Sequence, residues 1–215
     1  MKGFIFDVDG TLLDSMHVWE HLGDELLNSY QIQARENLDE RYATLSLQEA
    51  LQDLHLRYLP QLDMQELAQG LSSLIKQRYA TLHLKPGALS FVKKIHRLKL
   101  PMAIVSAGEK AVTMPILERC GIIPYMQFYM GCEEAGGNKH QPDIFLQAAH
   151  KLGCKPEDVI VIEDAYHAMK AAKLAGMKVW AIEEARQMHA LEQIKATADI
   201  YVHSFHEMEE LICIK

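Results

Sequence analysis

The sequence predicts an α/β fold, with a parallel sheet that carries helices on both faces and a small all-helical segment inserted after the first strand. From residue 101 onward, short apolar runs alternate with helical patterns, which is the arrangement expected of a parallel sheet. Residues 16–80, in contrast, show helical spacing only. The chain has 215 residues, of which 49% are apolar and 24% are charged, so it can build a large core.

The first strand is predicted at residues 3–6, where an apolar run opens the chain. Similar short runs predict further strands at 101–105, 126–130, 159–162, 178–182 and 199–202. Helical patterns lie beside these runs at 90–98, 109–120, 143–152, 166–175, 186–196 and 206–214. Pro115 falls inside the second helix, and proline lacks the backbone N–H that an interior position needs. That helix therefore either starts near Thr113 or is kinked.

The segment 16–80 is predicted to form three or four helices. Its apolar residues make three stripes at helical spacing: Met16, Trp19, Leu22 and Leu26; Leu47, Leu51, Leu54 and Tyr58; and Leu67, Leu71, Leu74 and Ile75. The pair Pro86-Gly87 marks the break that follows. We therefore expect an α/β core formed by residues 1–15 and 81–215, and a helical insertion at 16–80.

Two carboxylates follow the first strand. Side chains two positions apart on a strand share a face, so Asp7 and Asp9 can reach one site. Carboxylates that lie so close repel each other, unless a cation lies between them or one of them is protonated. Gly10 lets the chain turn away from the strand, and Thr11 offers a hydroxyl and a backbone N–H to an anion. An acidic strand end that only caps a turn is the plainer alternative.

Other polar residues follow the later strands. Ser106 comes after the run at 101–105, and Glu163 and Asp164 come after the run at 159–162. Lys139 lies in a glycine-containing loop after the run at 126–130. Taken singly, these residues are typical of a helix cap, a polar loop and a solvated loop charge. Because ligands bind at the carboxyl ends of the strands in an open parallel sheet, we expect them to converge with the two aspartates.

These segments together resemble the four motifs of the haloacid dehalogenase-like hydrolases, in order and over nearly the whole chain. Phe4-Ile5-Phe6-Asp7-Val8-Asp9-Gly10-Thr11 resembles the first motif, and Ser106 the second. Lys139 with Gln141-Pro142-Asp143 resembles the third, and Glu163-Asp164 the fourth. The resemblance implies a Rossmann-like core with a helical cap. It points to the helical-cap phosphatase branch, which includes beta-phosphoglucomutase-like proteins.

The resemblance also implies roles for the acidic residues. Asp7 is the implied nucleophile and forms an aspartyl-phosphate. Asp9 is the implied general acid, which protonates the leaving oxygen and then activates water. The implied cofactor is Mg²⁺, a hard cation that prefers carboxylate oxygens. Its implied ligands are Asp7, Asp164 and the backbone carbonyl of Asp9, with Glu163 supporting the metal shell.

A second set of residues is implied to bind phosphate: Thr11, Ser106, Lys139 and the backbone N–H groups around Ala107. An anionic nucleophile that attacks an anionic phosphate needs charge compensation, and Lys139 is expected to supply part of it.

Several positions depart from the family pattern. Asn138-Lys139-His140 stands where Gly-Lys-Pro is common, and Glu163-Asp164-Ala165 where Glu-Asp-Ser is common, with Ala168 at a usual glycine. Compared with beta-phosphoglucomutases, Trp19 replaces a histidine and the region near Leu47 lacks an arginine. The missing arginine removes an anchor for a second phosphate, so hydrolysis is favoured over mutase action. We predict a phosphoric monoester hydrolase that is Mg²⁺-dependent and acts on a small phosphorylated metabolite.

Alternative functions stay open. One is a beta-phosphoglucomutase-like phosphosugar mutase, and another is a catalytically idle relative that binds phosphate. The second aspartate argues against the idle relative, which has no use for Asp9. A response-regulator receiver also uses clustered aspartates and Mg²⁺, but its phosphoacceptor follows a later strand and it has no large cap.

Composition excludes other classes. The net charge of -7 and the pI of about 5.9 argue against nucleic acid as the main partner. No apolar run approaches the roughly 20 residues of a membrane span, and the N-terminus shows no signal peptide. The cysteines are scattered and have no paired spacing, as expected of reduced thiols in a cytoplasmic protein: Cys120, Cys132, Cys154 and Cys213.

Two features of the helical segment have competing interpretations. His17 and His21 lie four apart, which is a zinc-site spacing, but no third ligand is evident and a surface pair is preferred. Trp19 and Met16 follow the catalytic loop directly, so they either line the substrate cavity or pack inside the helical segment.

Overall fold

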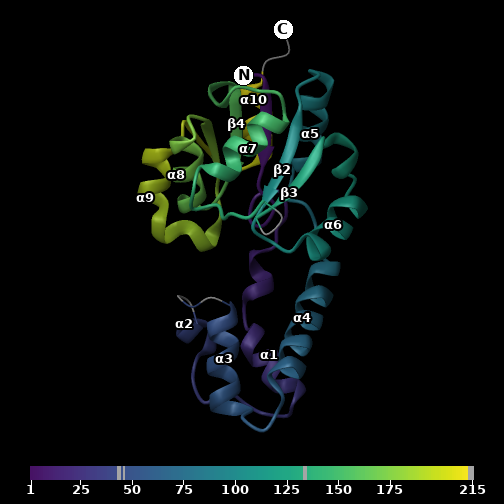
Figure 1. Ribbon diagram of the computed structural model, residues 1–215, viewed down its shortest axis with the longest axis vertical. Helices are drawn as coiled ribbons and strands as arrows, with labels where there is room; N and C mark the ends of the chain where they lie inside the picture. The colour runs from purple at the N-terminus through teal and green to yellow at the C-terminus, as the bar shows by residue number, and fades with distance from the viewer. Residues whose placement is uncertain (43–44, 46, 133–134, 213–215) are drawn as a thin grey trace. The chain divides into compact units, whose positions relative to one another are not determined.

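The computed structural model describes residues 1–42, 45, 47–132 and 135–212. The chain divides into two compact units, Met1–Ser15 with Leu82–Lys215 and Met16–Thr81. Figure 1 shows both units. That the smaller unit acts as a cap stays a prediction.

The larger unit contains a six-stranded parallel sheet in the order β3-β2-β1-β4-β5-β6 (Figure 1). The strands lie within two residues of their predicted positions: β1 (Gly3–Phe6), β2 (Met102–Ser106), β3 (Phe128–Gly131), β4 (Val159–Glu163), β5 (Lys178–Ile182) and β6 (Ile200–Val202). The predicted fold class, an α/β protein with a Rossmann-like parallel core, is confirmed.

Strand β1 lies between β2 and β4, and the strand order reverses there. Phe6, the last residue of β1, is in register with Ile104 of β2 and with Ile162 of β4. The chain builds one half of the sheet through β2 and β3 and the other half through β4, β5 and β6. Such a reversal leaves a crevice at the carboxyl ends of the central strands, which is where ligands bind in sheets of this type.

One face of the sheet packs on helices from the carboxyl-terminal half of the chain. Alternate strand residues, among them Ile5, Ala103 and Val161, form a buried cluster with the apolar faces of three helices. These helices are α7 (Asp143–Lys151), α8 (Tyr166–Leu174) and α9 (Leu191–Thr197). Because strand side chains alternate between faces, the residues between them are free to build a second core.

The opposite face is aromatic. Phe4 and Phe6 of β1 each pack edge-on against Phe91 of α5 (Ala88–Arg97), with ring centroids 6.1 and 6.2 Å apart. Phe91 in turn contacts Phe205 of α10 (Phe205–Leu211) at 5.5 Å. All four rings are fully buried. The core therefore lies on both faces of the sheet, as the expected fold requires.

Three details of the larger unit differ from expectation. Helix α6 (Lys110–Arg119) contains Pro115 in its interior, so a start near Thr113 is wrong. The helix predicted at 186–196 is divided into a 3-10 helix, η4 (Ala185–Ala190), and α9. Short 3-10 turns η2 (Ile123–Tyr125) and η3 (Pro156–Asp158) were not predicted. Residues 213–214 of the last predicted helix lie outside the described residues, as does Cys213.

The regular elements that the structure describes in the smaller unit are all helices, as predicted: 3-10 helix η1 (Met16–Trp19), α1 (Leu22–Ser29), α2 (Leu38–Tyr42), α3 (Leu47–Tyr58) and α4 (Met64–Ala80). The first stripe does not lie on one helix, because His21 adopts a left-handed conformation with φ 54° between η1 and α1. Leu47, the first member of the second stripe, is 46% exposed, whereas Leu54 and Tyr58 are buried. Asp63 caps α4 through the backbone N–H groups of Gln65 and Glu66.

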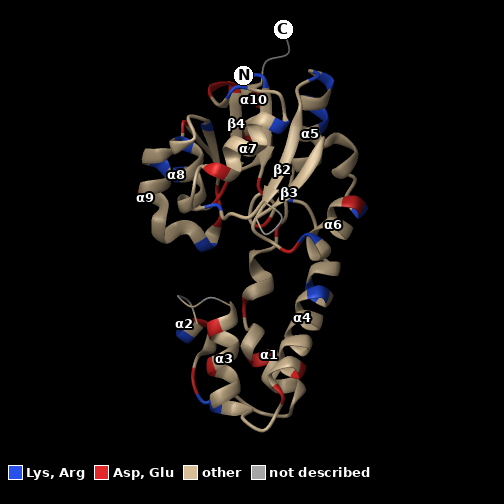
Figure 2. Ribbon diagram, in the orientation of Figure 1, with Lys and Arg blue, Asp and Glu red and all other residues tan. Residues whose placement is uncertain are grey.

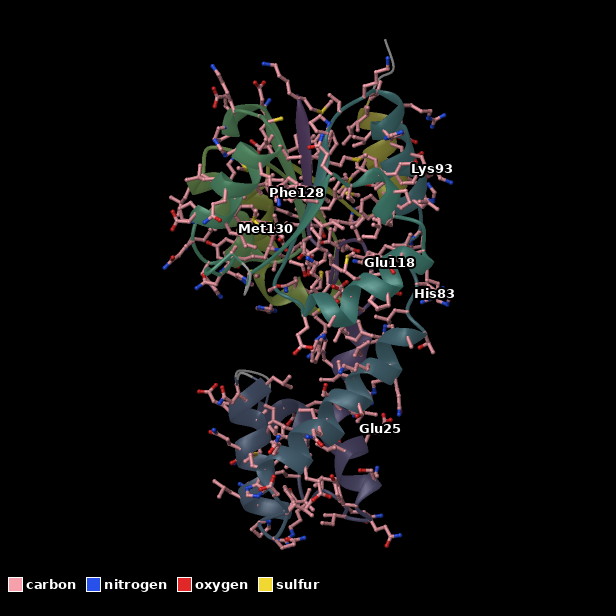
Figure 3. The ribbon with its side chains drawn as sticks, turned by 45° about the vertical axis from the view of Figure 1, so that its right-hand side comes forward. Glu25, His83, Lys93, Glu118, Phe128 and Met130 are labelled. Atoms are coloured by element: carbon pink, nitrogen blue, oxygen red, sulfur yellow. The ribbon has the colours of Figure 1, made fainter. Side chains whose placement is uncertain are left out.

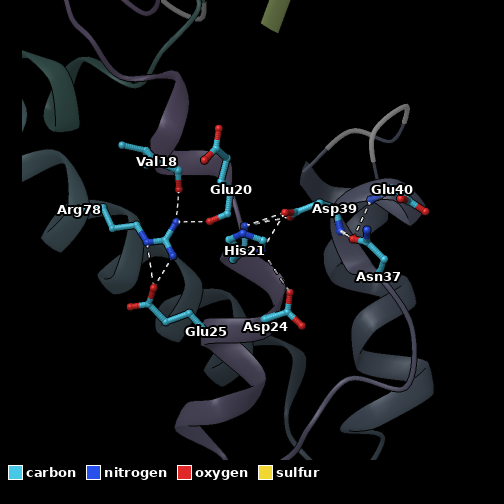
Figure 4. Close-up of polar contacts among 9 residues, drawn as sticks. All are labelled: Val18, Glu20, His21, Asp24, Glu25, Asn37, Asp39, Glu40 and Arg78. Atoms are coloured by element: carbon cyan, nitrogen blue, oxygen red, sulfur yellow. Dashed lines mark hydrogen bonds and ion pairs between the residues drawn. The ribbon is translucent and has the colours of Figure 1, made fainter. Parts of the chain in front are cut away.

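Polar contacts hold the junction between η1 and α1 inside the smaller unit (Figure 4). Arg78 of α4 donates to the carbonyls of Val18 and Glu20 and pairs with Glu25. His21 donates its backbone N–H to Asp39, 2.9 Å away, and its Nδ1 lies 3.0 Å from the same carboxylate. Thus the left-handed turn at His21 is stabilised from two sides.

The His17 and His21 side chains are both exposed. The partners of His21 are Asp39 and, at 3.9 Å, Asp24. Ligand atoms of His21, Asp24 and Asp39 lie within 4.8 Å of one another, a grouping that sequence spacing did not reveal. His17 does not belong to this grouping, in which Asp39 also accepts the backbone N–H of His21.

No helix in the described ranges is both long and apolar enough to cross a membrane. Lys and Arg are interspersed with Asp and Glu along the helices of both units (Figure 2). The cysteines that the structure describes, Cys120, Cys132 and Cys154, carry free thiols.

Candidate active site

Three carboxylates meet at the carboxyl ends of β1 and β4. Asp7 follows β1 and donates its backbone N–H to Ile162 of β4 at 3.0 Å, which places it beside the end of that strand. Glu163 ends β4 and Asp164 follows it. Carboxylate oxygens of Asp7, Glu163 and Asp164 lie within 4.8 Å of one another, and all three residues are buried. We call these three residues the acidic cluster.

Lys139 is the cation of this cluster. Its Nζ lies 2.6 Å from Asp7 Oδ1 and also pairs with Glu163, and its side chain is only 4% exposed. Burial alone would lower the pKa of the ammonium, but the charges of Asp7 and Glu163 outweigh burial and raise it. Lys139 is therefore protonated and holds the Asp7 carboxylate in place.

One ammonium does not balance three carboxylates. Burial raises the pKa of Glu163 to about 7, and the charge of Asp7 acts in the same direction. Burial also raises the pKa of Asp164 well above its usual range, with Glu163 and Asp7 adding to the effect. Both shifts express a deficit of positive charge in this buried site.

The acidic cluster fits Mg²⁺. Its donors are carboxylate oxygens, the ligands that this hard cation prefers, and they converge from two strand ends. A divalent cation would also supply the positive charge that Lys139 alone does not. Asp9 is not a member of the cluster through its carboxylate. The predicted part of Asp9 in metal binding is its backbone carbonyl, and this stays a prediction.

The loop after Asp7 is shaped to fit around Asp164. Gly10 has φ 81°, and a Cβ at this position would lie 2.6 Å from Asp164 Oδ2, so only glycine fits. The hydroxyl of Thr11 donates to Asp164 Oδ1 at 3.1 Å, and its backbone N–H donates to Val8. The hydroxyl of Thr11 that was predicted to bind phosphate thus orients a carboxylate in this structure, and the backbone N–H closes the loop onto Val8. Its phosphate contact stays a prediction.

Asp9 lies against the turn that follows β2. An ideal Cβ on Gly108 would lie 2.8 Å from Asp9 Oδ2 and 3.4 Å from Ser106 Oγ, so the three residues are packed together. Ser106 is 1% exposed, and its Oγ accepts the backbone N–H of Gly108 at 3.0 Å. Ala107 is exposed between them. The structure therefore places the predicted Asp9, Ser106 and Ala107 on the β2 side of Asp7.

The departure at the fourth motif has a local explanation. Glu163 Oε1 accepts the backbone N–H groups of Asp164 and Ala165, both at 3.2 Å. These bonds shape the turn into α8 without a hydroxyl at position 165. Ala168 is a residue of α8 itself, and it is fully buried in the apolar core.

Some residues near the site were not predicted. Ser15 is buried and accepts the backbone N–H of Gly10 at 3.2 Å. His140, next to Lys139, stacks on His167 of α8 with ring centroids 4.3 Å apart. Burial lowers the pKa of His167, and the neighbouring His140 and Lys139 lower it further. No spacing in the sequence marks these residues, because each contact joins separate segments or lies within an irregular turn.

Trp19 and Met16 lie in the smaller unit. Trp19 is half-buried and packs edge-on against Tyr79 of α4, with ring centroids 6.2 Å apart. Of the two roles predicted for Trp19, this contact agrees with packing inside the helical segment. A contact of Trp19 or Met16 with substrate stays a prediction.

Comparison with known proteins assigns the family. The family model described as haloacid dehalogenase-like hydrolase matches residues 4–182, which includes all four predicted motifs. The chain belongs to this family. The resemblance seen in the sequence is thereby confirmed.

Named relatives lie within this haloacid dehalogenase-like group. Hexitol phosphatase A of Escherichia coli is 24% identical over 209 residues, covering 96% of this chain and 93% of that protein. Fructose-1-phosphate phosphatase YqaB of Escherichia coli is 29% identical over 180 residues, covering 81% and 93%. These names agree with the predicted enzyme class, a phosphoric monoester hydrolase.

A solved structure supports the fold of this haloacid dehalogenase-like chain. A Thermotoga maritima protein described as a candidate beta-phosphoglucomutase superposes with a TM-score of 0.86 at 21% identity. The match covers 99% of this chain and 100% of that one. At this identity the likeness concerns the fold.

Proposed function

We propose that this protein is a Mg²⁺-dependent phosphatase that hydrolyses a small sugar or polyol phosphate through an aspartyl-phosphate on Asp7. The observation that carries the proposal is the buried acidic cluster with Lys139 on Asp7, set beside Asp9 and Ser106. The names of two relatives, a hexitol phosphatase and a fructose-1-phosphate phosphatase, support this substrate class.

Charge compensation is the first requirement of the reaction. Asp7, Asp164 and Glu163 would hold Mg²⁺, which supplies positive charge to the phosphoryl oxygens when it is bound. Lys139 fixes one oxygen of Asp7 and lowers the repulsion between this carboxylate and the incoming phosphate. Ser106 and the N–H groups of the following turn donate hydrogen bonds to phosphate oxygens.

The chemical steps then use two carboxylates of this chain. The Asp7 carboxylate attacks phosphorus, and the bond from phosphorus to the leaving oxygen breaks as Asp9 gives that oxygen its proton. Asp9, now ionised, takes a proton from water, and the water oxygen attacks phosphorus. The bond between Asp7 and phosphorus breaks, which releases inorganic phosphate and restores the Asp7 carboxylate and the protonated Asp9.

The test is phosphate release from a panel of hexose and hexitol phosphates, with and without Mg²⁺ and EDTA. We expect turnover that needs Mg²⁺ and a trapped phosphoenzyme on Asp7. Equal turnover after thorough metal removal would overturn the metal assignment, and absence of turnover across the panel would overturn the substrate class.

The mutase alternative is tested by the same panel. The fold is also that of a candidate beta-phosphoglucomutase, which is the reason to include a hexose 1-phosphate. Conversion to the 6-phosphate without release of inorganic phosphate would replace hydrolysis by mutase action. A cytoplasmic location stays a prediction as well.

A further inference from the structure

Strand β3 carries a tyrosine near the site. This strand lies in the half of the sheet beyond β2, whereas the acidic residues of β4 lie on the other side of β1. Phe128 and Met130 of β3, labelled in Figure 3, pack on the cluster formed with α7 and α8. Tyr129 lies between them and therefore faces the other side of the sheet. It is in register with Ile104, two residues before Ser106 on the neighbouring strand. A long side chain at Tyr129 can thus reach the end of β2.

The phenol of Tyr129 ends among hydroxyl and carbonyl groups. Its Oη lies 2.9 Å from Thr113 Oγ1 on α6 and donates to the carbonyl of Gly108 at 3.3 Å. Gly108 in turn donates its backbone N–H to Ser106 Oγ at 3.0 Å, which links the phenol to Ser106 through the turn. Tyr129 is 9% exposed, and Thr113 and Ser106 are each 1% exposed. Burying a polar group costs free energy unless the group is hydrogen-bonded, and the phenol of Tyr129 is hydrogen-bonded here.

These contacts hold the turn on which Ser106 and Asp9 depend. Thr113 Oγ1 donates to the carbonyl of Glu109 at 3.3 Å, and Tyr129 Oη donates to the carbonyl of Gly108. Gly108 is packed against the Asp9 carboxylate so closely that a Cβ would lie 2.8 Å from it. A shift of this turn would therefore move both the hydroxyl that is proposed to bind phosphate and the neighbour of the general acid.

The hydrogens of the phenol and the serine can be accounted for. Burial raises the pKa of Tyr129, and the Asp9 and Asp7 charges add to this, against the hydrogen bonds from Ser106 and Thr113. Tyr129 is thus a neutral phenol with one hydrogen to donate. With this hydrogen the phenol donates to the carbonyl of Gly108, so the turn stays held when Ser106 gives its own hydrogen to a phosphate oxygen.

We propose that Tyr129, supported by Thr113, is a positioning residue that aims Ser106 and the turn 106–109 at the phosphoryl group. The inference rests on the proposed function, because it assigns Ser106 to phosphate. Tyr129 acts through Ser106 and does not itself touch the reacting atoms. Nothing in the four sequence motifs points to position 129 or 113.

The test compares variants that remove single oxygen atoms. Tyr129→Phe keeps the ring and removes the hydroxyl, and Thr113→Val does the same for the threonine. We expect Tyr129→Phe to weaken binding of inorganic phosphate, measured by calorimetry with Mg²⁺ present, by about tenfold (~1.4 kcal/mol). Thr113→Val should weaken it less, and Thr113→Ser should restore the wild-type value. The Mg²⁺ concentration for half-maximal activity should not change.

Tyr201→Phe is the matched control. Tyr201 lies on β6, and the substitution removes a phenol hydroxyl that donates to Glu183 at 2.7 Å. It should leave phosphate affinity unchanged. Wild-type phosphate affinity in Tyr129→Phe, with or without lower thermal stability, would overturn the inference and leave the proposed hydrolysis intact. Tyrosine-dependent phosphate binding by an enzyme that hydrolyses nothing would support the inference and overturn the proposed function. A wild-type protein that neither binds phosphate nor hydrolyses any substrate would overturn both.

Discussion

Replacement of Asp164 by asparagine is expected to stabilise the metal-free protein while it abolishes activity. Asp164 is buried beside Asp7 and Glu163, and among the described residues Lys139 is the cation that pairs with this group. Asparagine has the same shape and keeps an oxygen to accept the hydroxyl of Thr11, which now donates to Asp164 Oδ1 at 3.1 Å. The substitution therefore removes charge and leaves the packing nearly unchanged.

The magnitude follows from the spacing of the carboxylates. Two unit charges 4.8 Å apart repel by about 3.5 kcal/mol at an effective dielectric constant of about 20. Raising the pKa of Glu163 from 4.5 to about 7 corresponds to a similar cost, about 3 kcal/mol above neutral pH. Loss of the attraction to Lys139 offsets part of the gain. We expect a net stabilisation of about 2–3 kcal/mol, or roughly 5–10 °C in Tm for a chain of this length.

The gain depends on pH in a defined direction. Carboxyl groups whose pKa is raised by folding stabilise the native state below their unfolded pKa values, here 3.8 and 4.5, and this contribution is lost as pH rises through the folded values. The wild-type protein in EDTA should lose stability between about pH 4.5 and pH 7. The advantage of Asp164→Asn should be small near pH 4 and largest near pH 8. Saturating Mg²⁺ should remove it, since only the wild-type site gains binding energy.

Thermal unfolding in EDTA at a series of pH values measures this directly. Asp158→Asn is a matched control, because Asp158 forms a surface ion pair with Lys2 at 2.8 Å and its pKa is lowered by that partner. Its loss should change stability only slightly, and in the destabilising direction, because the ion pair lies at the surface. A metal-free Asp164→Asn protein that is less stable than the wild type at pH 8 would refute the reasoning about buried charge.

Other substitutions test the site and the smaller unit. Asp7→Asn should abolish turnover and phosphoenzyme formation, whereas Asp9→Asn should slow turnover by about 10²-fold or more and leave Mg²⁺ binding largely intact; a phosphoenzyme trapped elsewhere than on Asp7 would contradict this assignment. Gly10→Ala should reduce kcat and Tm far more than Gly121→Ala. Both glycines have positive φ, but of these two only Gly10 faces a carboxylate. Equal effects of the two substitutions in activity and melting assays would argue against the clash. Trp19→Ala should change the relative kcat/KM among substrates without changing Mg²⁺ affinity. An unchanged substrate profile with lower stability would show that Trp19 serves only to pack against Tyr79.

The elements of the sheet were predictable because the signal is local. Strand β5 coincides with the predicted range 178–182, since an apolar run bounded by polar residues marks both of its ends. The left-handed His21 was not predictable, because tertiary contacts to Asp39 and Arg78 stabilise that turn. At Pro115 the sequence left open a helix that starts near Thr113 or one that is kinked, and the structure excludes the first because α6 begins at Lys110.

The acidic half of the site was predictable from position along the chain. Asp7, Glu163 and Asp164 follow strands that lie side by side, and strand order brings their oxygens together. Tyr129 and Thr113 were not predictable, because they lie 16 residues apart on a strand and a helix and meet only through the register of β3 with β2. Alternation along β3 places Tyr129 on one face, but nothing local says which group it will meet there.

The two sides of the site differ in charge: charged residues lie on the side of β4, and neutral hydroxyls lie on the side of β2 and β3. On the side of β4, the acidic cluster carries more negative charge than Lys139 offsets. A bound cation would therefore stabilise this side. On the side of β2 and β3, Thr113 and Tyr129 are neutral hydroxyls that hydrogen-bond to each other, and Ser106 Oγ accepts the backbone N–H of Gly108. Neutral donors can turn toward a phosphate oxygen without leaving a charge buried when the phosphate leaves. In the proposed reaction, this division would let the anionic nucleophile and the anionic substrate share one site, with the compensating positive charge next to the nucleophile.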